Sequence, residues 1–246
     1  MSDTSPSRTP TTIDAIAERW VSTLAQLDPD VAIYAGVPGP VEQFADYSPA
    51  GVEQFASAAR AVLAELDAAP VVDDVDRVTV ADLSSELRLQ LELHDAGWTE
   101  RDLNVIASPA QSVREIFDLL PTSTSADWAT IAAKLGNVGA ALEGYAETLR
   151  EGIRVGRTPA RRQVERVLEQ ARRHAARDGF FAEFTSSASP QDGLSEGLRT
   201  DLLRGAESAA AAYAGFADFL AQELAPAATD VDAVGRELYA LHSRRF

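Results

Sequence analysis

Residues 125–153 read SADWATIAAKLGNVGAALEGYAETLREGI, and this stretch decides the fold class. Its apolar residues recur every three or four positions, which is the spacing of one face of an α-helix. Gly136-Asn137 is a weak break, so the pattern predicts two consecutive helices. The apolar stripe consists of Trp128, Ile131, Leu135, Leu142, Tyr145, Leu149 and Ile153.

The same spacing recurs on both sides of this stretch, and no window alternates apolar and polar residues as a strand does. We therefore expect an all-α, bundle-like array of roughly nine to eleven helices with little or no strand. The stripes begin at Ile13, Val52, Val80, Val113, Val164 and Leu198, and a last short helix is expected from Val234 onward.

A residue able to cap a helix precedes proline at five places. The side-chain oxygen can accept a hydrogen bond from a free N–H at a helix start, and proline at the next position has no N–H to leave unpaired. Four of these pairs predict helix starts, at Asp28-Pro29, Ser48-Pro49, Ser108-Pro109 and Thr158-Pro159. The fifth, Ser189-Pro190, lies in a segment that we expect to be a loop.

Composition indicates a globular protein. The 246 residues are 46% hydrophobic and 24% charged, and cysteine is absent, which excludes disulfides and thiolate chemistry. Residues 1–12 are polar, and the richest apolar run, 209–220, is too short to span a bilayer. We expect a disordered tail over 1–11, a single helical domain over 12–246 and a cytoplasmic location.

The charge is uneven along the chain. The net charge of −16 disfavours nucleic acid and membranes as partners. Residues 150–177, however, carry nine arginines and only three glutamates. Arg162, Arg166 and Arg173 share one face of a predicted helix there, and they are candidate substrate-binding residues for an anion or a substrate carboxylate. The alternative is a solvated surface that pairs with acidic residues nearby.

No residue pattern predicts a metal site. The three histidines are too far apart in sequence for a helical zinc motif. The acidic run Asp73, Asp74 and Asp76 alternates like a calcium loop but lacks its glycine and closing glutamate, so we expect it to cap a helix.

A serine-hydrolase reading is also weak. Ser195 lies in a Gly-x-Ser-x-Gly sequence, with Asp230 or Asp232 and then His242 further along. That motif needs a strand before the serine, and none is expected here, so we predict no catalytic residue.

Several segments together resemble a bacterial family named domain of unknown function 885. Their order and spacing make the combination specific, although no single motif does. The segments are 32–39 (AIYAGVPG), 46–51 (DYSPAG), 103–109 (LNVIASP), 117–121 (FDLLP), 149–153 (LREGI), 161–165 (RRQVE) and 234–239 (VGRELY).

The resemblance implies a longer, mainly helical protein related to zincin-type metallopeptidases. In that family a His-Glu-x-x-Pro-Gly-His-His segment lies in the C-terminal half, and no position here matches it. The resemblance therefore implies that this chain is the N-terminal half, inactive alone, with zinc expected only in the C-terminal half.

The final helix, which lacks a stop signal, fits that expectation. Partners would then be the C-terminal half, or a second copy through an exposed apolar seam. The alternative is a free-standing helical interaction or ligand-binding protein.

Overall fold

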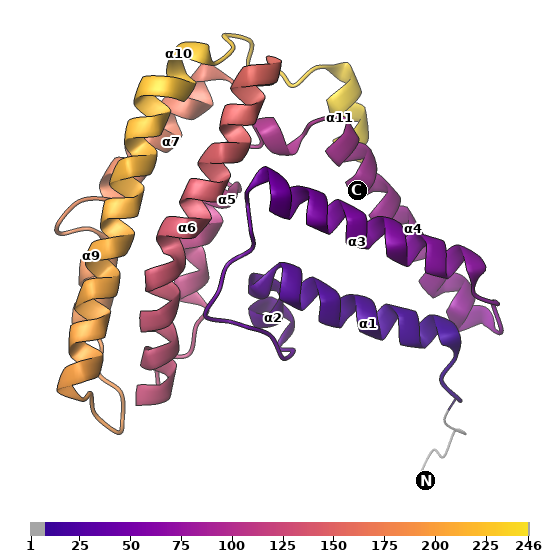
Figure 1. Ribbon diagram of the computed structural model, residues 1–246, viewed down its shortest axis with the longest axis horizontal. Coiled ribbons are helices and arrows are strands. Elements are labelled where there is room, and N and C mark those ends of the chain that lie inside the picture. The colour runs from indigo at the N-terminus through magenta and orange to yellow at the C-terminus, as the bar shows by residue number, and fades with distance from the viewer. Residues whose placement is uncertain (1–7, 246) are drawn as a thin grey trace.

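The predicted all-α fold is confirmed by the computed structural model, which describes residues 8–245 (Figure 1). Within those residues the β-type pairing is a single isolated parallel bridge between Ala160 and Thr229. The α-helices are α1 (Thr12–Leu27), α2 (Pro29–Ala35), α3 (Pro49–Ala68), α4 (Asp74–Asp95), α5 (Pro109–Glu115), α6 (Ser125–Val155), α7 (Arg161–His174), α8 (Phe180–Ser186), α9 (Glu196–Phe219), α10 (Ala225–Ala227) and α11 (Arg236–His242). Shorter helical turns are η1 (Thr99–Arg101), η2 (Ile116–Asp118) and η4 (Ser243–Arg245), while η3 (Leu220–Leu224) is a π-helical turn.

Helix α6 is one continuous helix, so the predicted break at Gly136-Asn137 is wrong. The helix begins behind a capping box of Thr124 and Asp127. Glycine inside a helix costs only about 1 kcal/mol, and the neighbouring turns bury enough surface to exceed that cost. Asn137 also donates a hydrogen bond to the carbonyl of Glu42 (2.9 Å), so its side chain serves a tertiary contact instead of ending the helix.

Helices α6 and α9 lie side by side and run in the same direction (Figure 1). Asp192, just before α9, accepts hydrogen bonds from Ser125 at the start of α6. At the other end, Arg150 forms a two-bond ion pair with Glu223 (2.8 and 2.9 Å). The helices approach closely because Gly205 faces Leu135, where an added methyl would lie 2.8 Å from the Leu135 Cβ. This pair is the centre of the largest hydrophobic core.

The helices form two lobes. Helices α1, α3 and α4 form the N-terminal lobe, which packs around Trp20, Ala59 and Leu87 and has a second small cluster at its far end. Helices α5 to α10 form the C-terminal lobe and contain the main core. Helix α11 leaves the C-terminal lobe and packs against α4, where Arg244 pairs with Glu92 (Figure 1).

Residues 41–48 join the two lobes by lying along α6. Lys134, the only lysine of the sequence, is fully buried there. Its ammonium donates to Asp30 Oδ1 (2.8 Å) and to the carbonyls of Val41 (3.1 Å) and Gln43 (2.5 Å). It also lies 4.0 Å from the centre of the Phe44 ring. Burial lowers the pKa of the lysine and raises that of the aspartate, while their mutual attraction opposes both shifts.

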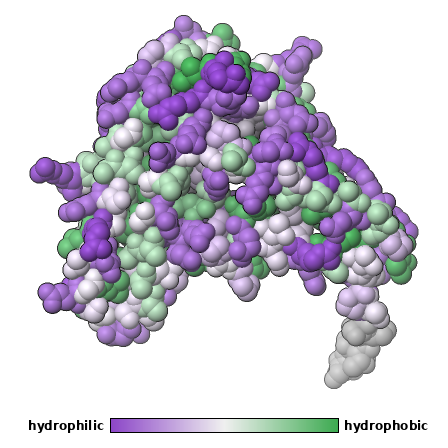
Figure 2. Space-filling view, in the orientation of Figure 1, coloured by the Kyte–Doolittle hydropathy of each residue, from purple (hydrophilic) through white to green (hydrophobic). Residues whose placement is uncertain are grey.

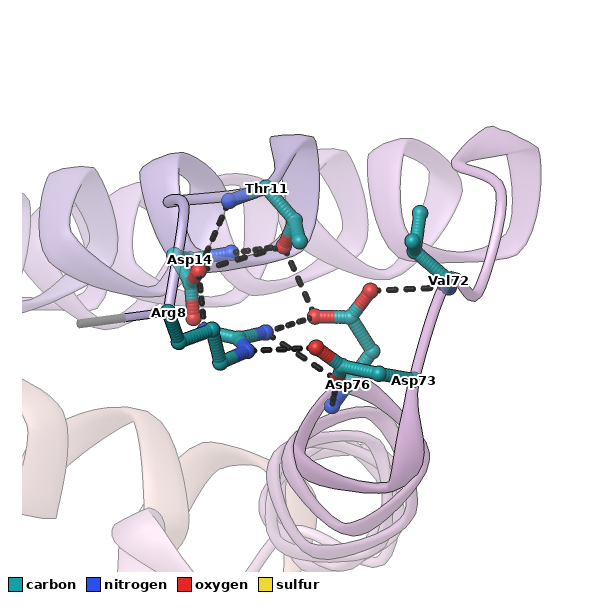
Figure 3. A network of polar contacts seen from close by, with 6 residues as sticks. All are labelled: Arg8, Thr11, Asp14, Val72, Asp73 and Asp76. Atoms are coloured by element: carbon teal, nitrogen blue, oxygen red, sulfur yellow. Dashed lines mark hydrogen bonds and ion pairs between the residues drawn. The ribbon is translucent and has the colours of Figure 1, made fainter. Parts of the chain in front are cut away.

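A polar network ties the starts of α1 and α4 together (Figure 3). Asp73 caps α4 by accepting from the Asp76 N–H (2.9 Å), so the prediction that this acidic run caps a helix is confirmed, with α4 starting at Asp74. The Asp76 carboxylate is fully buried and accepts from Arg8 (2.6 Å), Thr11 (2.7 Å) and the Val72 N–H (2.9 Å).

The predicted tail, 1–11, is described only from residue 8 onward, and residues 1–7 lie outside the described residues. No helix within residues 8–245 combines the length and apolar character needed to cross a membrane. The predicted cytoplasmic location stays a prediction.

Three of the four predicted cap-proline helix starts are confirmed: those at Asp28, Ser48 and Ser108. The fourth, at Thr158, is wrong. Helix α7 begins after Ala160 because Pro159 and the Thr158 hydroxyl face residues 227–229 instead. Ser189-Pro190 lies in a loop, as predicted, and Ser195 caps α9. Helix α8, built on Phe180, Phe181 and Phe184, was not predicted from the sequence.

Replacing Lys134 by methionine is expected to cost about 3–5 kcal/mol of unfolding free energy, because the Asp30 carboxylate would stay buried without its partner. Urea unfolding measures this loss. Adding Asp30→Asn to the same chain should recover part of it, and Arg199→Met, at an exposed position, is the control. A loss below about 1 kcal/mol for Lys134→Met would show that this contact does not hold the lobes together.

The Asp73 carboxylate should make stability depend on acid pH. The Arg8 guanidinium and then the Asp76 N–H lower the pKa of Asp73 from 3.8 to about 2. A lowered pKa in the folded state stabilises the fold above pH 3.8, and this contribution is lost as pH falls toward 2. The difference in urea midpoint between wild type and Asp73→Asn should therefore shrink between these values, whereas Asp82→Asn, at an exposed position of α4, should show no such trend. A constant difference for Asp73→Asn would contradict the ion pair.

Candidate functional site

A cavity of about 220 Å³ lies where the connection after α4, the start of α7 and the chain after α10 meet. We call residues 228–235 the strap, because they cross from the C-terminal lobe to α11, and we call this hollow the strap cavity. Its lining is Trp98, Arg101, Leu103, Asn104, Thr158, Pro159, Ala160, Gln163, Thr229, Val231, Asp232, Ala233 and Val234.

One wall of the cavity is the segment 98–108, which α6 and α7 hold in place. Turn η1 packs directly on α6 at Gly152, where an added methyl would lie 2.3 Å from the Glu100 carbonyl oxygen. The Tyr145 hydroxyl donates to the Asp102 carbonyl (2.5 Å). Gln163 accepts from the Val105 N–H, and Gln170 donates to the Val105 carbonyl (both 3.1 Å). These amides pair with the backbone as a neighbouring strand would, so the wall is fixed although it has no regular structure.

The strap forms the opposite wall, and Arg161 anchors it. The N–H of Arg161 donates to the Thr229 carbonyl (2.7 Å), and the Thr229 N–H donates to the Pro159 carbonyl (3.3 Å). The Arg161 guanidinium donates to the Asp230 carboxylate (2.7 Å), to the Ala228 carbonyl (3.0 Å) and to the Ala225 carbonyl. Arg161 therefore holds the strap and is not available for a ligand.

Arg101 lines the cavity, and the residue after it, Asp102, is a second charged group of unusual environment. Arg101 is partly buried, and burial together with the nearby Arg157 lowers its pKa, which marks a cation that the protein only partly neutralises. Its Nε donates to the Gly97 carbonyl (3.1 Å). Burial raises the pKa of the neighbouring Asp102 to about 6, against the effect of a hydrogen bond from Trp98. Groups with shifted pKa values in a cavity are candidates for ligand contact.

The three predicted arginines do not meet at one point. Arg162 lies at the rim of the strap cavity, 3.2 Å from the Asp232 carboxylate that lines it. Arg166 is exposed one turn further and pairs with Glu169 (2.9 Å). Arg173 is exposed near the end of α7, eleven residues or about 16 Å along the axis from Arg162. Arg101 was not predicted from the sequence. It lies in a polar loop within an acidic part of the chain, and no periodic pattern distinguishes it.

The residues of the serine-hydrolase alternative serve other roles. Ser195 caps α9 and accepts from the Leu198 N–H (3.2 Å). Asp230 and Asp232 pair with Arg161 and Arg162, while the His242 ring lies 4.0 Å from Trp98 in an edge-on contact. The contacts within residues 8–245 do not join these residues into a triad.

Zinc, which the family resemblance implies, has no ligand set in the described part of the chain. No group of three or more His, Asp or Glu side chains in residues 8–245 is arranged to hold a metal ion. His94 faces Glu53 (3.2 Å), and His174 packs on Tyr213, where burial lowers its pKa to about 4. We therefore derive no reaction step through zinc.

Comparison with known proteins identifies the family. The family model described as "Bacterial protein of unknown function (DUF885)" matches residues 29–246. No curated protein matches the chain. The match includes α2 to α11 and therefore both walls of the strap cavity. The chain belongs to the DUF885 family.

Proposed function

We propose that this chain is a non-catalytic helical scaffold of a zinc-dependent, peptidase-like hydrolase, and that the strap cavity binds the carboxylate of a peptide. The observation that supports this most is Arg101, a partly buried cation in the cavity wall. Arg162 lies nearby, where it pairs with the lining residue Asp232 at 3.2 Å, and a peptide carboxylate would have to compete with Asp232 for it. Arginine matches a carboxylate with two parallel N–H donors, and a partly desolvated arginine binds it more strongly than an exposed one.

The wider arginine face extends this proposal. Arg166 and Arg173 continue along α7 away from the cavity. A peptide whose carboxylate lies at Arg101 and Arg162 would place earlier residues along α7, where acidic side chains could pair with Arg166 and Arg173. Their present exposure makes each such contact weak.

The chemistry would come from elsewhere. On this proposal the zinc ligands and the general base belong to the C-terminal half of the longer family fold, outside residues 8–245. Zinc would supply a Lewis acid and an activated water there. The residues described here would bind and orient the peptide, and the chain alone would be inactive.

An apolar seam along α6 and α9 is the surface proposed for a partner. Small residues line two hollows of about 400 and 340 Å³ between these helices. Figure 2 shows pale, weakly hydrophobic residues over this face, bordered by hydrophilic ones. The small residues include Ala132, Ala133, Gly136, Gly139, Ala212 and Gly215. In this chain we propose a second copy as the occupant, since the rim carries both signs of charge, Asp201 and Arg204 at one hollow and Glu143 and Arg150 at the other.

A short peptide with a free C-terminal carboxylate should bind this chain at least tenfold more tightly than its C-terminal amide, because a charge-assisted contact contributes about 1.5–3 kcal/mol. Calorimetric titration of tetra-alanine acid and amide measures the difference. Arg162→Gln and Arg101→Gln should each reduce it, Arg166→Gln and Arg173→Gln should act only on peptides with acidic side chains, and Arg199→Gln is the control for charge.

Equal affinity for acid and amide would refute the carboxylate site. Stoichiometric zinc retained by the chain, or peptide hydrolysis by the chain alone, would refute the non-catalytic role. Esterase activity lost in Ser195→Ala would instead establish the serine-hydrolase alternative. Absence of peptide binding together with binding of another small molecule would favour the free-standing ligand-binding protein.

Self-association through the seam is expected and can be tested by sedimentation velocity. An added methyl at Gly136 or Gly215 meets no atom within 4 Å, so arginine at both positions fits the single chain but blocks close approach of a second copy. The double variant Gly136→Arg with Gly215→Arg should shift the protein to monomer. Ser85→Arg, at an exposed position of α4, should leave the degree of association unchanged. A monomeric wild type would contradict the seam.

A further inference from the structure

A second cavity, of about 170 Å³, lies within the N-terminal lobe where α1, α3 and α4 meet the segment 45–46. We call it the lobe cavity. Its location is independent of the strap cavity's arginines, although Trp98 lines both hollows. What it could bind goes beyond the proposed peptide function.

Most of the lobe cavity is apolar. Its volume is close to that of an engineered 150 Å³ protein cavity that binds benzene, so it can hold one small ring or a short alkyl chain. The apolar wall consists of Leu27, Val52, Phe55, Ala56, Leu91 and Leu93.

Two acidic residues, Asp28 and Asp46, are among those that line the cavity. Asp28 is partly buried and caps α2, accepting from the Asp30 N–H at 3.2 Å. Asp46 lies at the exposed side and accepts from the Ser48 N–H at 2.9 Å. Each carboxylate can accept further hydrogen bonds beyond these. Lys134, the only lysine of the sequence, donates to Asp30 and two carbonyls, so no donor of its ammonium is left for Asp28 or Asp46.

The other titratable groups at the cavity do not reverse this sign. His94 also lines it, but its Nε2 faces the Glu53 carboxylate at 3.2 Å on the exposed side of α3. The Glu53 carboxylate also pairs with Arg60 (2.8 Å), so this group of residues carries both signs of charge. Burial is the main cause of the raised pKa of Asp28, and the nearby Asp30 adds to it, so this carboxylate would gain from a cation beside it.

We propose that the lobe cavity binds a small apolar primary amine, with the ammonium group between Asp28 and Asp46 and the apolar part against the wall of α3 and α4. An ammonium donates three hydrogen bonds, which suits two carboxylates with free acceptor positions. The acidic surface of the protein also concentrates cations and not anions near the cavity.

Benzylamine, benzyl alcohol and benzoate have nearly the same shape and differ in charge, so they test the proposal directly. In ligand-observed NMR and calorimetry at neutral pH, benzylamine should bind at least tenfold more tightly than benzyl alcohol, and benzoate should not bind. Asp28→Asn and Asp46→Asn keep the side-chain oxygen that accepts from a backbone N–H but remove the charge, and each should weaken benzylamine binding about tenfold.

Asp82→Asn removes the same charge from an exposed position of α4 and should leave benzylamine binding unchanged. Val52→Phe fills the cavity and should abolish binding of all three probes, and if it fails to fold, the asparagine variants still decide. Equal binding of benzylamine and benzyl alcohol, or benzylamine binding that survives both asparagine variants, would overturn the proposal. Because Arg101 and Arg162 are untouched, the peptide result stays separate from this one.

Discussion

The buried ammonium of Lys134 is the contact on which the arrangement of the two lobes depends. It satisfies Asp30 and two carbonyls of a segment that has no regular structure of its own. Asn137 and Thr148, one to four turns further along α6, bind the carbonyls of Glu42 and Tyr47. Helix α6 thus serves as the hydrogen-bonding partner of residues 41–48, which explains how an irregular segment can lie against a core without unpaired backbone groups.

The same contacts show why the sequence predicts the helices but not their continuity. Apolar periodicity locates α1, α3, α4 and α9 because each buries one face. It cannot show that the Gly136-Asn137 pair lies inside a helix, since the stabilising contact of Asn137 comes from residue 42. Likewise Thr158-Pro159 resembles a helix start, yet its backbone pairs with Thr229, seventy residues away. Predictions from local sequence are confirmed where the hydrogen-bonding partner is also local, as for the helix caps Asp73 and Ser48.

The candidate site shows the same contrast between features set by local sequence and features set by tertiary contacts. Arg162 was predicted because a charged helical face is periodic, and it lies at a cavity rim. Arg161, one residue earlier, has the same sequence signal but anchors the strap. Arg101 has no periodic signal, and its role depends on η1 packing on Gly152 and on the strap closing over it. Both contacts are tertiary, so residue type and spacing alone cannot distinguish an arginine that lies at a cavity from one that anchors the strap.

The ligands proposed for the two cavities have opposite charges, and the protein that binds them is strongly acidic. With a net charge of −16, the long-range field attracts an amine to the lobe cavity and repels a carboxylate from the strap cavity. A carboxylate would therefore have to be held by short-range contact with a partly desolvated guanidinium, which salt screens little. Both the long-range field and the short-range contact with carboxylates would favour amine binding, and added salt would screen the field. Trp98 lines both cavities, and its ring packs edge-on against His242.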